Sequence, residues 1–86
     1  MAAIQDFLPW LHEAIERLRT SGWPAEADEL DAVARSAYTT SSEMLGEIGR
    51  TILRVERGLG PALPDEIAEL LRRCLVEIRK VWPGLR

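Results

Sequence analysis

Apolar residues recur three and four positions apart along most of this chain, in four segments separated by short links. This spacing places the apolar side chains on one face of an α-helix. It predicts helices over residues 3–19, 24–37, 41–57 and 65–82. We therefore expect an all-α fold in which the 86 residues form one domain. The links between the helices are short, and short links join antiparallel neighbours. The fold should be a compact bundle of four antiparallel helices whose first two form a helical hairpin.

Proline and glycine define the ends of these helices. Pro9 lies within the first segment, so that helix either begins beside Pro9, with the proline in its first turn, or bends there. Pro24 suits the first position of the second helix. Residues 58–64 contain too much glycine and proline to be helical, and the Pro-Gly pair at 83–84 ends the fourth helix.

The fourth segment carries the most regular apolar face of the chain, and we expect this face to point into the core. Its members are Ile67, Leu70, Leu71, Cys74, Leu75, Ile78, Val81 and Trp82. In the second helix the expected inward residues are Ala27, Leu30, Val33, Ala34 and Ala37. Cys74 should act there as a small apolar side chain rather than as a nucleophile.

A run of four hydroxyl residues at 39–42 opens the third helix. Thr40 and Glu43 have the spacing of a capping box, in which each side chain accepts the other residue's free backbone N–H. The free N–H groups at this helix start could also bind an anion, but the Glu43 carboxylate already fills that role. The segment also lacks the glycine and lysine pattern of a nucleotide-binding loop, so we expect no small-molecule ligand.

Two glycines within the third helix require an explanation, because each costs about 1 kcal/mol relative to alanine. Projection at 100° per residue aligns Gly46 and Gly49 with Ser42 and Leu53 in a stripe of mostly small residues. Such a stripe allows another backbone to approach closely. Three interpretations are open: packing within the chain, contact across a dimer, or a small-molecule or anion site.

Three tryptophans lie at the edges of the predicted helices, in a chain with only one phenylalanine and one tyrosine. They either close the ends of a small core or anchor a partner. Together with the small-residue stripe they make up the candidate interface, which consists of Ser42, Gly46, Gly49, Leu53, Trp10, Trp23 and Trp82.

Charge is divided unevenly along the chain, whose formal net charge is -3. Residues 1–49 hold nine acids and three bases, whereas residues 50–86 hold five acids and eight bases. The two halves either attract each other within one bundle or associate head to tail between chains. The densest basic cluster, Arg72, Arg73, Arg79 and Lys80, is interpreted as a solvated face of the fourth helix.

Several classes of function are disfavoured by what the chain lacks. His12 and Cys74 are its only histidine and cysteine, so we expect no zinc site, disulfide, cofactor or catalytic pair. The acidic balance argues against nucleic acid as a partner. No signal peptide and no apolar run of about 20 residues is present, which predicts a cytoplasmic protein without a membrane partner.

The remaining interpretation is a non-catalytic protein–protein interaction or regulatory module, with a second copy in a homodimer or another protein as its partner. The alternative is a DNA-binding helix-turn-helix formed by residues 34–50. That alternative fits poorly, because Tyr38 stands where a turn glycine is usual and the second helix would present Glu43 and Glu47 to an anionic groove.

Overall fold

The structure is a computed structural model that describes residues 7–86, and within them it contains four α-helices and no strand. The helices are α1 (Leu8–Thr20), α2 (Pro24–Arg35), α3 (Ser41–Leu59) and α4 (Asp65–Ile78), with a short 3₁₀ helix, η2 (Gly60–Ala62), between α3 and α4. The all-α fold and the four helices predicted from the sequence are confirmed.

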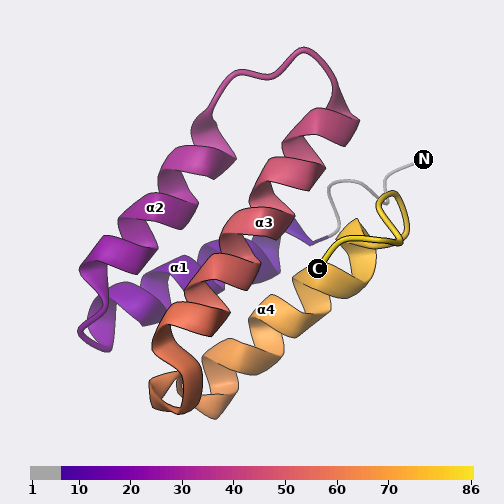
Figure 1. Cartoon of the computed structure of the whole chain (residues 1–86). Helices are drawn as coiled ribbons and strands as arrows, with labels where there is room; N and C mark the ends of the chain where they lie inside the picture. Colours follow the sequence, from indigo (N-terminus) through magenta and orange to yellow (C-terminus); the bar gives the residue numbers. More distant parts are fainter. Residues whose placement is uncertain (1–6) are drawn as a thin grey trace.

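The helices form a closed arrangement around one core. In Figure 1, α2, α3 and α4 lie side by side and alternate in direction, while α1 crosses behind them. The main contacts of α1 are with α2 and α4, and those of α3 are likewise with α2 and α4. The resulting globule measures 34 × 23 × 20 Å.

The core is almost entirely apolar and draws on all four helices. The fully or nearly fully buried residues are Phe7, Leu11, Ala14, Ile15, Leu18, Ala27, Leu30, Leu45, Ile48, Ile52, Val55, Leu59, Ile67, Leu70, Leu71, Cys74, Leu75 and Ile78. Thr51 is the one polar side chain among the described residues that is buried, and its hydroxyl donates to the backbone oxygen of Glu47 at 2.9 Å. The bond satisfies the buried hydroxyl, as burial requires.

Helix α1 begins at Leu8 with Pro9 in its first turn, which is the first of the two alternatives for this proline. A proline costs nothing there, because the missing N–H has no partner within the helix. Phe7 precedes the helix and is fully buried. The predicted start at residue 3, with Ile4 on the apolar face, lies outside the described residues.

Helix α2 ends two residues earlier than predicted, at Arg35, so that Ala37 is exposed instead of facing the core. Two side chains donate hydrogen bonds to backbone carbonyl oxygens in the last turn of α2. Ser36 Oγ donates to the oxygen of Ala32 at 2.8 Å, and the Tyr38 hydroxyl donates to the oxygen of Val33 at 2.9 Å. These bonds replace the helical ones that a longer α2 would have made.

Helix α4 also ends early, at Ile78, which corrects the prediction that Val81 and Trp82 face inward from a helix. These two residues are 41% and 38% exposed. Pro83 prevents the helix from continuing, because it has no N–H and disfavours the helical conformation of Trp82. The last turn before it already tightens, since the Lys80 N–H donates to the oxygen of Glu77, three residues back, at 3.2 Å. The chain turns instead, and the Val81 N–H donates to the oxygen of Ile78 at 3.0 Å. Residues 79–86, here called the C-terminal strap, then lie against α3.

Candidate interaction site

The start of α3 is held by the predicted cap, with one change. Thr40 Oγ1 accepts the N–H of Glu43 at 3.1 Å, as a capping box requires. The Glu43 carboxylate accepts the N–H of Thr39 at 3.1 Å, whereas the prediction was the N–H of Thr40. A carboxylate therefore already stands at the positive end of the helix dipole.

Three residues of α3 form the surface that the strap covers, and we call them the glycine face: Ser42, Gly46 and Gly49. Both glycines are buried. A β-carbon added to Gly46 would lie 3.4 Å from the ring of Trp82. One added to Gly49 would overlap Leu85 Cδ2 and lie 3.2 Å from Ile78 Cγ2. The glycines thus permit close packing by a segment of the same chain, and that segment is not a helix.

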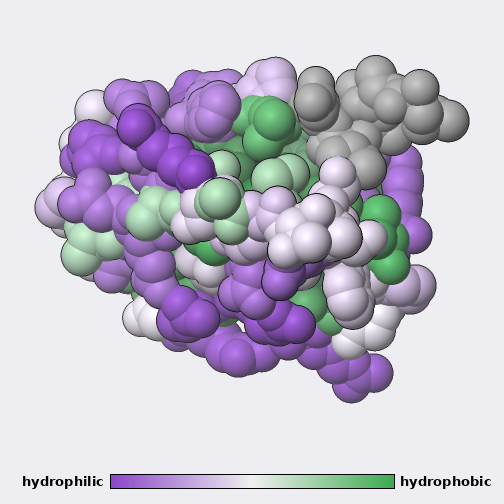
Figure 2. Space-filling model, turned by 90° about the horizontal axis from the view of Figure 1, so that it is seen from above, coloured by the Kyte–Doolittle hydropathy of each residue, from purple (hydrophilic) through white to green (hydrophobic). Residues whose placement is uncertain are grey.

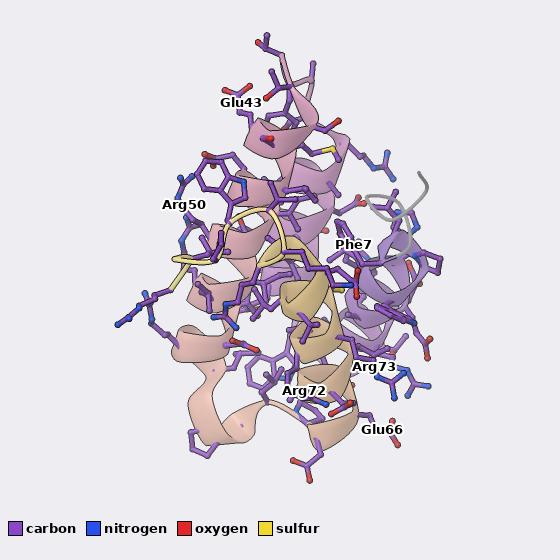
Figure 3. All side chains as sticks on the ribbon, turned by 90° about the vertical axis from the view of Figure 1, so that its right-hand side faces the viewer. Phe7, Glu43, Arg50, Glu66, Arg72 and Arg73 are labelled. Carbon is purple, nitrogen blue, oxygen red and sulfur yellow. The ribbon has the colours of Figure 1, made fainter. Side chains whose placement is uncertain are left out.

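Trp82 is the main contact between the strap and the glycine face. Its indole N–H donates to the backbone oxygen of Ser42 at 2.7 Å, while the ring lies on Gly46. The same ring forms one wall of a pocket of about 490 Å³. The other lining residues are Thr39, Thr40, Ser42, Glu43, Gly46, Glu47 and Arg50. In Figure 3 the strap crosses α3 close to Arg50, with Glu43 nearer the start of that helix.

The strap is folded back on itself by a few exposed hydrogen bonds. The Leu85 N–H donates to the oxygen of Trp82 at 3.1 Å, and Arg79 Nε donates to the oxygen of Leu85 at 3.2 Å. The Arg79 charge also acts on Glu56 of α3. Burial raises the pKa of the Glu56 carboxyl above its ordinary value, and the positive charge of Arg79 partly opposes that rise.

Exposed apolar side chains gather at this end of the sequence. Among residues 7–86, the large apolar side chains that are exposed are Val76, Val81 and Trp82. Figure 2 shows that hydrophilic side chains cover most of the face seen from above, with hydrophobic ones between them and at the right-hand edge. Exposed apolar surface of this kind marks interaction sites when it is clustered.

The other candidate interface residues lie elsewhere. Trp10 is half-buried on α1, and the Arg73 guanidinium carbon lies 5.9 Å from the centre of its ring. Trp23 is half-buried before α2, and its backbone N–H donates to the oxygen of Leu18 at 2.9 Å. Both pack against the core, as does Leu53. The structure therefore brings together Ser42, Gly46, Gly49 and Trp82 but not these three.

Leu85 is the contact residue that the sequence analysis missed. It is partly buried and packs against the core over Gly49. No helical periodicity includes it, because it follows the Pro-Gly pair that ends the apolar pattern. The one signal in the sequence was an apolar residue placed three positions after Trp82, across that turn.

The basic cluster of α4 is largely paired with acids of the same helix. Arg72 and Arg73 both donate to Glu69, at 2.6 and 3.2 Å, and these hydrogen bonds lower the pKa of that carboxyl. Lys80 pairs with Glu77 at 3.0 Å. In Figure 3, Arg72 and Arg73 lie in the lower half of the view, well below Glu43 and Arg50 of α3. Arg72 and Arg73 are therefore not part of the candidate site, whereas Arg79 and Lys80 belong to the strap.

Among residues 7–86, three ion pairs join different helices: Arg17 with Glu66, Arg19 with Asp28, and Arg54 with Glu29. Only the last joins a base of residues 50–86 to an acid of residues 1–49, and each involves exposed groups. Such pairs contribute about 0–1 kcal/mol each. The attraction between the two halves of the chain therefore adds little to the fold.

Cys74 and His12, the two side chains considered as a catalytic pair, differ in their burial. Cys74 is fully buried, and burial raises the pKa of its thiol to about 12. His12 is exposed on α1. Within residues 7–86, no group of three histidine, cysteine or acidic side chains is arranged to hold a metal ion. No helix in that part of the chain has the length and apolar character needed to cross a membrane.

The segment proposed for DNA binding has the geometry of a hairpin. Figure 1 shows α2 and α3 running side by side in opposite directions across the loop at 36–40. In a helix-turn-helix the two helices cross at roughly 90–120°. Glu43, which would enter the groove first, is exposed.

Comparison with family models, curated proteins and solved structures gave no match for this chain.

Proposed function

We propose that this protein is a non-catalytic interaction module that self-associates as a homodimer through its C-terminal end. The observation that carries the proposal is that its exposed large apolar side chains lie close together in the sequence, on α4 and the strap that follows it. Val76, Val81 and Trp82 are 48%, 41% and 38% exposed and lie within one stretch of seven residues. Elsewhere in residues 7–86, no large apolar side chain is exposed to this degree.

Burial of this surface supplies a driving force for association. Apolar surface removed from water contributes about 25 cal/mol per Å². Tryptophan is also among the residue types enriched at the positions that dominate binding energy. A chain of this size buries a smaller fraction of its surface on folding than larger domains do, so a shared interface adds stability that the monomer lacks.

A charge placed in this surface tests the proposal. Val81→Glu should prevent dimerisation without unfolding the protein, because the side chain is exposed in the monomer. Ala25→Glu is the matched control, since Ala25 is exposed at the start of α2, far from the strap in Figure 1. Light scattering over a concentration series should show dimers for the wild type and the control, and monomers for Val81→Glu.

The melting temperatures of the dilute proteins provide the second half of this test. All three should melt alike, since the substitutions touch no buried group. A wild type that remains monomeric up to millimolar concentration would contradict the proposal, as would a Val81→Glu protein that dimerises as well as Ala25→Glu.

A further inference from the structure

We propose that the outer face of α4 binds an acidic segment of another protein. We call this surface the basic face, and it consists of Arg72, Arg73, Val76, Arg79 and Lys80. It shares Val76 with the surface proposed for self-association, but the binding of an acidic segment does not depend on that association. The sequence alone predicts a solvated face here, whereas the arrangement of these side chains favours an anionic partner.

Val76 lies at the centre of the basic face. It is more exposed than any other large apolar side chain of residues 7–86. Residues three and four positions apart lie on the same side of a helix, and Arg72, Arg73 and Arg79 have this spacing from Val76. The backbone is still helical at Arg79, whose N–H donates to the oxygen of Leu75 at 2.8 Å. Positive groups therefore surround an exposed apolar side chain.

The bases of this face reach farther into solvent than the acids that they contact. Arg72 and Arg73 both donate to Glu69, so that one carboxylate serves two guanidinium groups. The side chains of both arginines are more exposed than that of Glu69. The contrast is larger for Lys80 and Glu77, whose side chains are 63% and 19% exposed. The charge that meets solvent on this face is therefore mainly positive.

The two arginines on α4 are held in place before any partner binds. Arg72 donates to Glu69 through two of its nitrogens, at 3.2 and 2.6 Å. Arg73 donates through Nε alone, and its guanidinium lies over the ring of Trp10 on α1. Neither terminal nitrogen of Arg73 donates a hydrogen bond within residues 7–86, so both can bind a carboxylate. Such preorganisation lowers the entropic cost of binding.

These groups together indicate the chemistry of the partner. Carboxylates match the guanidinium groups, because arginine binds them through two parallel hydrogen bonds. Exposed ion pairs are weak, so the carboxylates of a partner can compete with Glu69 for Arg72 and Arg73. Val76 requires in addition an apolar side chain between the carboxylates. A protein segment that alternates acidic and apolar residues supplies both, and the charges of the two surfaces are then complementary.

Binding of a synthetic peptide of repeated Glu-Glu-Leu triplets to the intact protein tests this proposal. A peptide of glutamate alone and one of repeated Lys-Lys-Leu triplets are the comparisons for the apolar and the charged contacts. Fluorescence anisotropy of the labelled peptides measures each affinity, with the protein dilute so that self-association does not interfere. We expect the Glu-Glu-Leu peptide to bind about tenfold more tightly than either comparison, and salt to weaken its binding.

Variants of the basic face show where the peptide binds. Arg72→Gln combined with Arg73→Gln should weaken binding about tenfold, since it removes both guanidinium groups. Val76→Thr keeps the shape of the side chain but makes it polar, and should weaken binding about threefold. Arg35→Gln is the matched control, because Arg35 is also an exposed arginine paired with an acid of its own helix, Asp31. It belongs to α2, which α3 separates from α4 in Figure 1, and its loss should leave the affinity unchanged.

The melting temperatures of these variants should match that of the wild type, because each substitution is at an exposed position. A wild type that does not bind the Glu-Glu-Leu peptide, or binds the Lys-Lys-Leu peptide as tightly, would overturn the proposal. Unchanged affinity in the double arginine variant would do the same. Vesicles of phosphatidylcholine and phosphatidylserine are a further probe, and tighter binding to them than to the peptide would identify a lipid surface instead.

Failure of this proposal is distinguishable from failure of the proposed self-association. A wild type that stays monomeric at millimolar concentration but binds the acidic peptide through Arg72 and Arg73 would remove the homodimer and support the basic face. A wild type that dimerises but does not bind the peptide would give the reverse result.

Discussion

Leu85 fills the space that the absent side chain of Gly49 leaves on α3, and a β-carbon at position 49 would overlap Leu85 Cδ2. The glycine is therefore matched to a residue 36 positions later in the chain. The energetic cost of a glycine within a helix is offset at this position by tertiary packing.

Gly49→Ala and Gly58→Ala should accordingly change stability in opposite directions. Gly58 has no neighbour near its added β-carbon, so alanine should stabilise the protein by about 0.5–1 kcal/mol through its better helix propensity. Gly49→Ala gains the same propensity but displaces Leu85 and crowds Ile78, and overpacking costs about 1–3 kcal/mol. Urea denaturation should show a net loss for Gly49→Ala. Equal stabilisation by both substitutions would mean that the strap does not press on α3.

Trp82→Phe isolates the hydrogen bond to Ser42 from the packing of the ring. Phenylalanine keeps an aromatic ring over Gly46 but lacks the indole N–H that donates at 2.7 Å. We expect a loss of about 0.5–1.5 kcal/mol in urea denaturation. Trp82→Ala should cost more, because it also removes the ring. A Trp82→Phe protein as stable as the wild type would show that this bond adds nothing.

Cys74 should resist thiol reagents as long as the protein is folded. Burial raises its pKa from 9.0 to about 12, so the folded state holds the proton over a pH range in which the unfolded state releases it. The contribution of Cys74 to stability is therefore lost as pH rises from about 9 to about 12. At pH 8 an aromatic disulfide reagent should label Cys74 only after urea is added. Rapid labelling of the native protein would place the thiol at the surface.

The carboxyl of Glu56 should report on the first residue of the strap. Its pKa is raised by burial, and the charge of Arg79 acts in the opposite direction. Arg79→Ala should therefore raise the Glu56 pKa further, as measured by carboxyl NMR titration. Arg57→Ala removes a charge from the residue next to Glu56 and serves as the comparison, and we expect the larger effect from Arg79. An unchanged Glu56 pKa in Arg79→Ala would show that the strap does not approach α3 at this point.

Hydrophobic periodicity predicted the helices and most of the core because each helix buries a single face. Leu30, Ile48 and Leu71 all lie where that pattern placed them, fully buried. The pattern was wrong at Ala37 and Val81, where the spacing of apolar residues continues past the point at which the helix stops. The ends of these two helices depend on Tyr38 and Pro83. The spacing of apolar residues carries no information about the effects of these two side chains.

The sequence also predicted that small residues of α3 form a stripe, because the stripe follows from the geometry of one helix. The segment that covers the stripe could not be predicted from the sequence. It is not helical, and its partnership with α3 depends on how α4 ends and on the turn before Trp82. Trp10 and Trp23 resembled Trp82 as residues at helix edges, yet they pack against the core without joining this surface.

Self-association of this chain through its C-terminal end is tested most directly by its mass in solution. Sedimentation equilibrium of the wild type should show an average mass that rises with concentration from the 9.7 kDa of one chain toward twice that value. Val81→Glu should remain at the lower mass throughout the same series. A wild-type mass that stays at one chain up to millimolar concentration would contradict the account.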